Sequence, residues 1–327
     1  MRIWIDLTNS PHVLFFEPLI KELKKNHKVI ITARDYQQTI PLLKEKNIPF
    51  IELGRYHGKS VVSKILGSLS EIFVRIKFIN KFKPDLSLSH HAQYSTIAAW
   101  ITRKKALYIF DGDKSVLQMM GIFFAPSLCP ENLPKKMYCI NPIRYPGLKE
   151  EIYLYNFKPD KNYLKKIGIK KKKYNIFIRP EATSASYIKG KGSLNPLLKE
   201  LEKEKDFQII MVPRTPDQKE YYKKRYKNIF IPDKVVDGPQ LISNVDLVIS
   251  GGGTMNRESV VLGTPVLSSF QNDPLTIDKW LIKEGYMILK REPAIKDIKK
   301  MLVNKKKYKI SSKGKKRVLE IIENILK

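Results

Sequence analysis

The stretch VISGGGTMNRESVVLGTPVLSSF, residues 248–270, has the residue types and spacing of a phosphate-binding turn. An apolar run leads into Gly251, Gly252 and Gly253, and a short segment of helical character follows. Glycines allow positive φ angles and let a ligand approach the backbone, and the N–H groups at a helix start attract phosphate. Glu258 lies about one turn into that helix, where a carboxylate can accept two hydrogen bonds from adjacent hydroxyls of a ribose. The stretch therefore predicts a site for a nucleotide phosphate.

Other interpretations of the glycine stretch fit it less well. Ser250 or Thr254 can cap the helix, and Gly-Thr-Pro at 263–265 stops it. The Gly-Lys-Ser/Thr of a P-loop is absent, and Asn256 stands where a dinucleotide fingerprint has its third glycine. The remaining alternative is an ordinary tight turn between a strand and a helix, with a glutamate on its surface.

Two arginines follow other apolar runs of the same half of the chain. Arg179 lies in FIRPEA and Arg214 in VPRTP, and Glu181 shares the first of these loops. Ligands of parallel sheets bind at the carboxyl ends of the strands. Two guanidinium groups there can hold a diphosphate and stabilise it as a leaving group. The alternative for each arginine is a plain surface residue.

The first half of the chain offers histidines and aspartates at the ends of two apolar runs. LSLSHH ends in His90 and His91, and FDGDK places Asp111 and Asp113 after the next run. Asp-x-Asp can hold a divalent metal with a diphosphate in some transferases. A histidine pair without a nearby carboxylate motif is more often part of a hydrogen-bonded structure than a catalyst.

The elements that must position these residues are alternating strands and helices, typical of βα units and parallel sheets. We expect helices at residues 14–25, 36–47, 60–82 and 94–103. The first series of strands is expected at 3–7, 29–34, 49–53, 86–90 and 106–110, with weaker ones at 122–126 and 136–140. The second series is expected at 174–180, 207–214, 228–232, 246–250, 265–270 and 286–290.

A segment with four prolines and a glycine but little periodicity, residues 141–161, reads as a linker between the two series. The chain therefore predicts two doubly wound, Rossmann-like domains, residues 1–150 and 151–327, each with a sheet of about six parallel strands. Residues 311–327 have an amphipathic pattern and are expected to form a terminal helix of the second domain.

The composition bounds the possible partners. Lys+Arg 61 against Asp+Glu 32 gives a net charge of +29, which favours nucleic acid, an anionic membrane or phosphorylated small molecules. A lysine-rich, heat-adapted source is the alternative explanation of this charge. Cys129 and Cys139 match no zinc or redox spacing and are expected to be buried thiols in a reducing compartment. The first residues do not resemble a signal peptide, and the longest uncharged run, 119–129, is too short to span a bilayer.

One predicted helix, at residues 61–83, combines an apolar stripe with flanking basic residues. The stripe is formed by Ile65, Leu69, Ile72, Ile76 and Ile79. A basic amphipathic helix can lie on an anionic membrane, although such a stripe more often packs on its own sheet.

The motifs in the second half resemble a known signature. Gly-Gly-Gly-Thr-Met, Glu258 and Leu-Gly-Thr-Pro are similar to the nucleotide-sugar motif of GT-B-fold proteins. Two such groups are the lipid-linked N-acetylglucosaminyltransferase of cell-wall synthesis and the non-hydrolysing UDP-N-acetylglucosamine 2-epimerases, in which a glutamate at this spacing holds the ribose. The whole chain also resembles an uncharacterised prokaryotic GT-B-like family, through phrases such as WIDLTNSPHVLFFEPLI, RYPGLKEE and GTMNRESVVLGTP.

The resemblance implies roles for further residues. In GT-B transferases the loop after the first strand faces the interdomain cleft and carries a histidine, a place that His12 occupies here. A histidine there suits a general base, with capping or phosphate binding as the alternatives. This chain has Ser10-Pro11 where those transferases have two glycines, so a different loop geometry is expected. Polar residues after the strand at 265–270 commonly hold the donor sugar; these are Gln271 and Asn272, for which a simple turn is the alternative.

The resemblance also implies that no metal or other cofactor is needed, because arginines and helix termini neutralise the phosphates. Asp111 is then a catalytic group, and the groups around the acceptor are Asn9, Ser10, His90, His91 and Asp113. The fold expected is GT-B-like, with two domains facing across a cleft, the first binding the acceptor and the second the nucleotide sugar.

Three functions follow from these observations. The first is a glycosyltransferase that moves a sugar from a UDP-type donor to an acceptor hydroxyl or lipid phosphate, in the cytoplasm or peripheral to the membrane. The second is a nucleotide-sugar 2-epimerase, although the Gly-Thr-Arg-Pro opening of the epimerases is replaced here by DLTNSPH. The third is a binding protein without catalysis; no nucleic-acid recognition motif supports specific binding to RNA or DNA.

Overall fold

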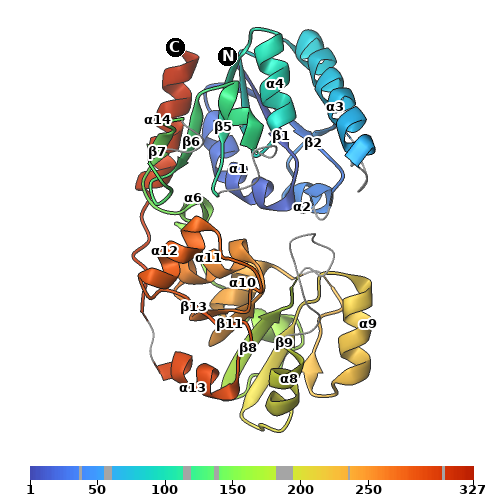
Figure 1. Ribbon diagram of the computed structural model, residues 1–327, viewed down its shortest axis with the longest axis vertical. Helices are drawn as coiled ribbons and strands as arrows, with labels where there is room; N and C mark the ends of the chain where they lie inside the picture. The colour runs from blue at the N-terminus through green and yellow to red at the C-terminus, as the bar shows by residue number, and fades with distance from the viewer. Residues whose placement is uncertain are drawn as a thin grey trace. The chain divides into compact units, whose positions relative to one another are not determined.

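The computed structural model describes residues 1–327 except 37–38, 55–60, 113–118, 136–139, 182–193, 235 and 304–305, and describes only the backbone of 61–66. The chain divides into two compact units, each described by itself (Figure 1). Unit 1 comprises Met1–Tyr155 together with Ser311–Lys327, and unit 2 comprises Asn156–Ile310. Asp113, a predicted site residue, lies outside the described residues.

Unit 1 contains a seven-stranded parallel sheet with the strand order β3-β2-β1-β4-β5-β6-β7. The order reverses between β1 and β4, which makes this the point where loops diverge and ligands of such sheets bind. The strands are β1 (Arg2–Leu7), β2 (Lys28–Ala33), β3 (Ile51–Glu52), β4 (Leu86–His90), β5 (Lys105–Ile109), β6 (Ser127–Pro130) and β7 (Ile143–Tyr145).

Helices cover the sheet of unit 1 because each presents an apolar face to it. Asn9 caps α1 by accepting the backbone N–H of Ser10, and Pro11 stands in the first turn, where its missing N–H costs nothing. Val13, Phe16 and similar residues of α1 then enter the core. The helices are α1 (Ser10–Leu23), α2 (Thr39–Glu45), α3 (Val61–Phe82), α4 (Gln93–Ile101), the 3₁₀ turn η1 (Met120–Phe123), α6 (Lys149–Leu154) and α14 (Lys313–Leu326).

Unit 2 repeats this plan with a six-stranded parallel sheet in the order β10-β9-β8-β11-β12-β13, reversing between β8 and β11. Its strands are β8 (Tyr174–Arg179), β9 (Phe207–Met211), β10 (Ile229–Phe230), β11 (Leu247–Ser250), β12 (Val266–Ser268) and β13 (Ile288–Leu289). Its helices are α7 (Tyr163–Lys166), α8 (Asn195–Leu201), α9 (Pro216–Arg225), α10 (Gly238–Ser243), α11 (Gly253–Leu262), α12 (Thr276–Lys283) and α13 (Ile295–Val303). The predicted pair of doubly wound, Rossmann-like domains is confirmed.

The terminal helix differs from the expectation that it belongs to the second domain. α14 packs in unit 1, where Val318, Ile321 and Ile322 join the core beneath α1 and the sheet. Gly314 lies so close to the backbone that an added Cβ would stand 2.6 Å from the carbonyl oxygen of Pro146. An amphipathic pattern shows that a helix needs a surface, but not which surface it uses.

Two predictions for the region between the two strand series are wrong: the weak strand at 122–126 and the linker at 141–161. Residues 122–126 do not form a strand; η1 occupies their start, and β6 follows at Ser127–Pro130. The predicted linker, 141–161, contains β7 and α6, both part of unit 1. The prolines and Gly147, with a φ of +80°, mark tight turns between these short elements rather than a flexible connection.

Ile72, Ile76 and Ile79 of the apolar stripe predicted for α3 pack in the core, but the buried face of this helix also contains charged residues. Leu69 of that stripe is 62% exposed, whereas Arg75 is fully buried and Glu71 nearly so. Arg75 Nε lies 2.8 Å from Asp6 Oδ2, and its Nη1 lies 2.5 Å from Glu71 Oε2. Charged side chains thus enter the core as a paired group beside Phe78 and Ile79, while Leu69 and Phe73 face outward. Among the described residues, no helix is both long and apolar enough to cross a bilayer.

Candidate functional site

The glycine stretch of unit 2 lies where the sequence predicts it, between β11 and α11 at the carboxyl edge of the sheet. Gly252 is the N-cap of α11, and no side chain caps the helix. Neither predicted cap therefore holds: Thr254 is inside the helix, and Ser250 Oγ accepts the N–H of Gly252 at 3.2 Å. Gly263, at a φ of +76°, ends the helix as predicted. An uncapped helix start leaves backbone N–H groups for an anion.

The three glycines are needed for close packing and not for positive φ angles. Among the described glycines with positive φ, none belongs to the stretch 251–253. A Cβ on Gly251 would lie 2.6 Å from Glu181 Cγ and 3.0 Å from its Cα. A Cβ on Gly252 would lie 2.5 Å from Arg214 Nη2. The backbone of the stretch thus touches the two loops that follow β8 and β9.

This packing gives a first testable prediction, for the substitution Gly251→Ala. The new methyl group collides with the backbone of Glu181 as well as its side chain, so the loop after β8 must move. We expect the free energy of unfolding of unit 2 to fall by about 1–3 kcal/mol, measured by urea denaturation. The matched control is Gly238→Ala, because nothing lies within 4 Å of a Cβ there and no change beyond the noise is expected. Equal stabilities of the two variants would contradict the packing argument.

The structure brings the two predicted arginines together at adjacent strand ends. Arg179 Nη1 donates to the carbonyl oxygens of Val212 and Pro213, at 2.8 and 3.0 Å, and Arg214 Nε donates to Pro180 O at 2.8 Å. Among the described residues no carboxylate forms an ion pair with Arg179. Burial, with the charge of Arg214 as a second cause, lowers the pKa of Arg179 to about 10. Two guanidinium groups held side by side in this way attract an anion.

Glu258 is buried in α11, one turn from the helix start, together with its neighbour Arg257. Arg257 forms a buried two-pronged ion pair with Asp278 of α12, at 2.8 and 3.3 Å. A Cβ on Gly253 would lie 3.2 Å from Asp278 Oδ2, so this ion pair packs closely against the glycine stretch. Sequence reasoning missed both residues of the pair, because a charged residue on a short helix normally reads as exposed.

The predicted sugar-holding residues lie after β12. The Gln271 amide donates to Ser269 O at 2.7 Å and to Arg291 O at 2.9 Å, so it already fastens the loop to a neighbouring segment. Asn272 Nδ2 is buried and has no hydrogen-bond partner among the described residues. Of the two, Asn272 has the amide that is available for a ligand.

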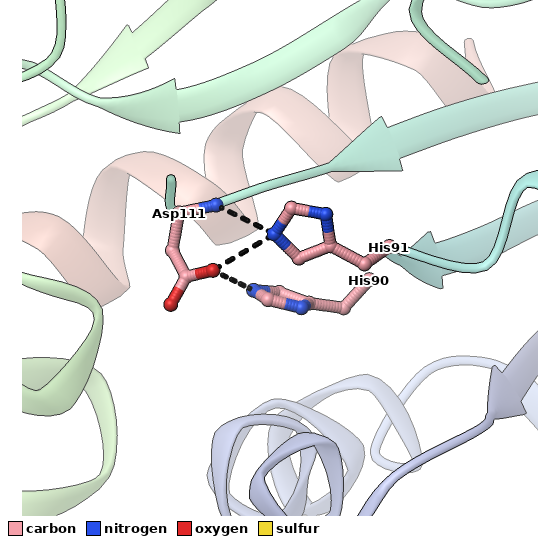
Figure 2. Close-up of side chains that lie close together, drawn as sticks. All are labelled: His90, His91 and Asp111. Atoms are coloured by element: carbon pink, nitrogen blue, oxygen red, sulfur yellow. Dashed lines mark hydrogen bonds and ion pairs between the residues drawn. The ribbon is translucent and has the colours of Figure 1, made fainter. Parts of the chain in front are cut away.

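Unit 1 gathers a second group of predicted residues at the carboxyl edges of β4 and β5 (Figure 2). His91 Nε2 lies 2.9 Å from Asp111 Oδ1, and His90 Nε2 lies 3.8 Å from the same oxygen. His91 has a φ of +49°, a left-handed conformation that is uncommon outside glycine and costs energy. Asp111 follows β5, which pairs with β4, so the two predicted strand ends bring this carboxylate to the histidines.

Lys149, at the start of α6, is the functional candidate that sequence reasoning missed. Its Nζ lies 2.5 Å from Asp111 Oδ2 and 3.8 Å from Glu150 Oε1, and its side chain is buried. Burial alone would raise the pKa of Asp111, but Lys149 and the hydrogen bond from His91 outweigh it, and this pKa lies well below its usual value. The ligand atoms of His90, His91 and Asp111 lie within 4.8 Å of one another, close enough for a metal ion. Lys149 already supplies the positive charge that such an ion would bring.

His12 joins the same group from α1, the helix after β1. Its ring centroid lies 4.6 Å from that of His90, and its Nδ1 lies 3.4 Å from the hydroxyl of Thr8. His90 is buried, and neither of its ring nitrogens has a hydrogen-bond partner among the described residues. Burial, and next the proximity of His12, hold the pKa of His90 well below its usual value, so this imidazole is neutral at neutral pH.

Two predicted members of the acceptor group have local structural tasks. Asn9 caps α1, which removes the alternative that His12 is the cap, and Ser10 is the first residue of that helix. Glu150 and Glu151 were the local signal that could have located α6 and Lys149, because acidic residues are enriched in the first turn of a helix.

Comparison with known proteins agrees with the architecture. An uncharacterized protein of Methanocaldococcus jannaschii is 30% identical over 301 residues, covering 88% of this chain and 87% of that protein. The UDP-GlcNAc 2-epimerase of the same organism, in complex with UDP-GlcNAc and UDP, superposes with a TM-score of 0.76 at 18% identity, over 99% of this chain and 100% of that one. The UDP-GlcNAc 2-epimerase from Neisseria meningitidis, bound to UDP-GlcNAc, gives 0.75 at 16% identity, over 99% and 100%.

The spinosyn rhamnosyltransferase SpnG, complexed with spinosyn aglycone, superposes with a TM-score of 0.63 at 14% identity, covering 100% of this chain and 96% of that one. At these identities the likeness shows the fold, and the expected GT-B-like fold is confirmed. The family described as protein of unknown function (DUF354) matches residues 1–327, and the chain belongs to this family.

Proposed function

We propose that the chain is a nucleotide-sugar enzyme of the GT-B type, a glycosyltransferase that binds a UDP-type donor through unit 2. The observation that carries the proposal is the pair Arg179 and Arg214 beside the uncapped start of α11. The two arginines supply positive charge, and the helix start supplies N–H donors at the same sheet edge. This combination suits a diphosphate and requires no metal ion. Glu258, in the same helix, holds the ribose, and Asn272 binds the sugar.

In this proposal the groups of unit 1 provide the proton chemistry. A histidine can take a proton from an acceptor hydroxyl, and His12, whose ring lies beside that of His90, is the residue of unit 1 that we assign to this role. Asp111 is ionised and fixed by Lys149 and His91, so orienting a histidine suits it better than exchanging protons. The acceptor is a hydroxyl or a lipid phosphate.

The experiment that tests the proposal is calorimetric titration with UDP and UDP-sugars. We expect Glu258→Ala to weaken binding by about 10- to 100-fold, because a carboxylate hydrogen-bonded to hydroxyls contributes about 1.5–3 kcal/mol. Glu258→Gln keeps the shape of the side chain and should show a smaller loss. Glu220→Ala, on the exposed side of α9, is the matched control. Unchanged affinity in a folded Glu258→Ala protein would show that the nucleotide assignment is wrong.

A second candidate is a nucleotide-sugar 2-epimerase, and the higher TM-scores of the two epimerases favour it. Epimerisation by elimination needs additional carboxylates that exchange protons, and Asp111 is poorly suited to this because Lys149 keeps it ionised. Incubation with UDP-GlcNAc alone separates the two reactions. Interconversion of epimers without an acceptor, followed by proton NMR, would favour the epimerase.

A further inference from the structure

Two features that the proposed reaction does not use lie on neighbouring elements of unit 1. These are the basic helix α3 and the uncharged run 119–129, which begins with η1. α3 packs against α4, and α4 packs against η1; Figure 1 shows α3 and α4 side by side. Large apolar side chains point outward from all three. They are Leu69 (62% exposed), Phe73 (57%), Trp100 (58%), Ile101 (48%) and Phe123 (50%), here called the α3–α4 face.

The exposed charged residues around the α3–α4 face are basic. Glu71, the only acidic residue of α3, is turned into the core and paired with Arg75. Lys77 extends over the ring of Phe73, with its Nζ 4.6 Å from the ring centroid. α4 and η1 contain no charged residue. The basic residues of the described part of these elements and the turns after them are Lys77, Lys81, Lys83, Arg103 and Lys104. The one acidic residue of the same turns, Asp85, is half-buried and accepts the backbone N–H of Arg2.

We propose that the α3–α4 face docks on the surface of an anionic lipid bilayer. Exposed Trp and Phe insert at the level of the lipid headgroups, and a border of lysine and arginine is attracted to anionic lipids. The aromatic rings give the apolar part of this attraction, and the basic border gives the electrostatic part. The shallow, outward-facing pattern suits a peripheral contact, with unit 1 lying on the headgroups.

Two other occupants fit the face less well. A second copy of this chain would bring one basic border against the other, and like charges that face each other at an interface oppose association. A nucleic acid would satisfy the basic border but leave Leu69 and Ile101 without an apolar partner. An anionic membrane matches both the charge and the apolar side chains.

The test is flotation of the full chain with phospholipid vesicles, compared between pure phosphatidylcholine and mixtures with about 30% phosphatidylglycerol. We expect binding to the anionic vesicles, weakened by salt. The double variant Phe73→Ser, Trp100→Ser should bind these vesicles at least about 10-fold more weakly, because two inserted rings are lost. Tyr221→Ser, at an exposed aromatic of α9 in unit 2, is the matched control and should bind normally. Lys77→Gln with Lys81→Gln should reduce both the affinity and its salt dependence.

Trp100 also provides a direct reading of the contact. Its fluorescence emission should shift to the blue when anionic vesicles are added, and the Trp100→Phe variant should lose that shift while still binding. The proposal is overturned if the double variant binds like the wild type, since attraction would then come from the net charge alone. It is also overturned if the wild type ignores vesicles and sedimentation shows a dimer that the double variant dissociates. Vesicle binding needs no nucleotide sugar, so either result leaves the proposed reaction untouched.

Discussion

Replacing Arg75 by methionine is expected to lower the free energy of unfolding of unit 1 by about 3–5 kcal/mol, because it removes the guanidinium that two buried carboxylates contact. Asp6 and Glu71 both contact this guanidinium, and all three side chains are at most 3% exposed. Burial alone would lower the pKa of Arg75, but the two carboxylates outweigh it and raise this pKa, so the arginine is charged in the folded state. Methionine fills much of the volume of the arginine side chain. The expected loss of stability therefore comes more from the buried charges than from a cavity.

The Asp6 carboxylate has a second partner, which explains why it cannot simply turn toward water. Its Oδ1 accepts a hydrogen bond from Thr32 at 2.7 Å, and Trp4 Nε1 donates to the Thr32 hydroxyl at 2.9 Å. The network therefore runs from the first strand through the second and into α3. When Arg75 is replaced, the hydrogen bonds among Asp6, Thr32 and Trp4 remain. The negative charge of Asp6 therefore stays buried.

The measurement is urea unfolding followed by tryptophan fluorescence in a Trp280→Phe background, in which the remaining tryptophans, Trp4 and Trp100, both belong to unit 1. Lys77→Met on the exposed side of the same helix is the control, with an expected change within about 0.5 kcal/mol. Adding Glu71→Gln to Arg75→Met removes one of the two buried negative charges that the guanidinium contacts and should recover part of the loss. A loss below about 1 kcal/mol for Arg75→Met would mean that water or another group compensates the carboxylates.

The buried network also shows where sequence reasoning meets its limit. Hydrophobic periodicity locates α3 over the predicted residues and places Ile72, Ile76 and Ile79 in the core, but it misses the charged pair that is buried on the same face. Glu71 and Arg75 are four residues apart, a spacing that normally marks a solvated ion pair on a helix surface. The third member, Asp6, is far away in the sequence, so nothing local indicates that the pair is neutralised in the core. Phe73 and Leu69 then face outward as a consequence.

Parts of the candidate site were predictable because their signals are local. The glycine stretch, its helix and Gly263 follow from residue types that have one structural solution, and strand ends place Arg179 and Arg214 at a common edge. Lys149 was not predictable in this way, because its partner Asp111 lies on another strand and a short helix beside prolines reads as a linker. Contacts between distant segments of the chain cannot be predicted in this way, because no local pattern in a single sequence indicates them.

The proposed proton chemistry gives the second large effect. If a histidine of unit 1 takes the proton of the acceptor, His12→Asn should lower the turnover number by about 10²- to 10⁴-fold, the usual contribution of a general base. Nucleotide-sugar affinity should stay within about two-fold, because the donor contacts assigned to unit 2 are unchanged. The measurement is UDP release with the donor and acceptor pair that gives the highest wild-type rate. His27→Asn is the control, since His27 pairs with Glu323 and precedes β2, at the opposite edge of the same sheet.

The same assay distinguishes His12 from its neighbour His90 as the base. The pKa of His90 lies well below the ordinary histidine value of about 6.5, because the ring is buried and lies beside His12. A group with a lowered pKa loses its proton-accepting form only at a correspondingly low pH. If His90 is the base, kcat/KM should therefore remain flat as the pH falls through 6.5, and His90→Asn should abolish turnover while His12→Asn retains it. A large loss in His12→Asn, with donor affinity intact, assigns the base to His12 and makes His90 the neutral group that keeps it in place.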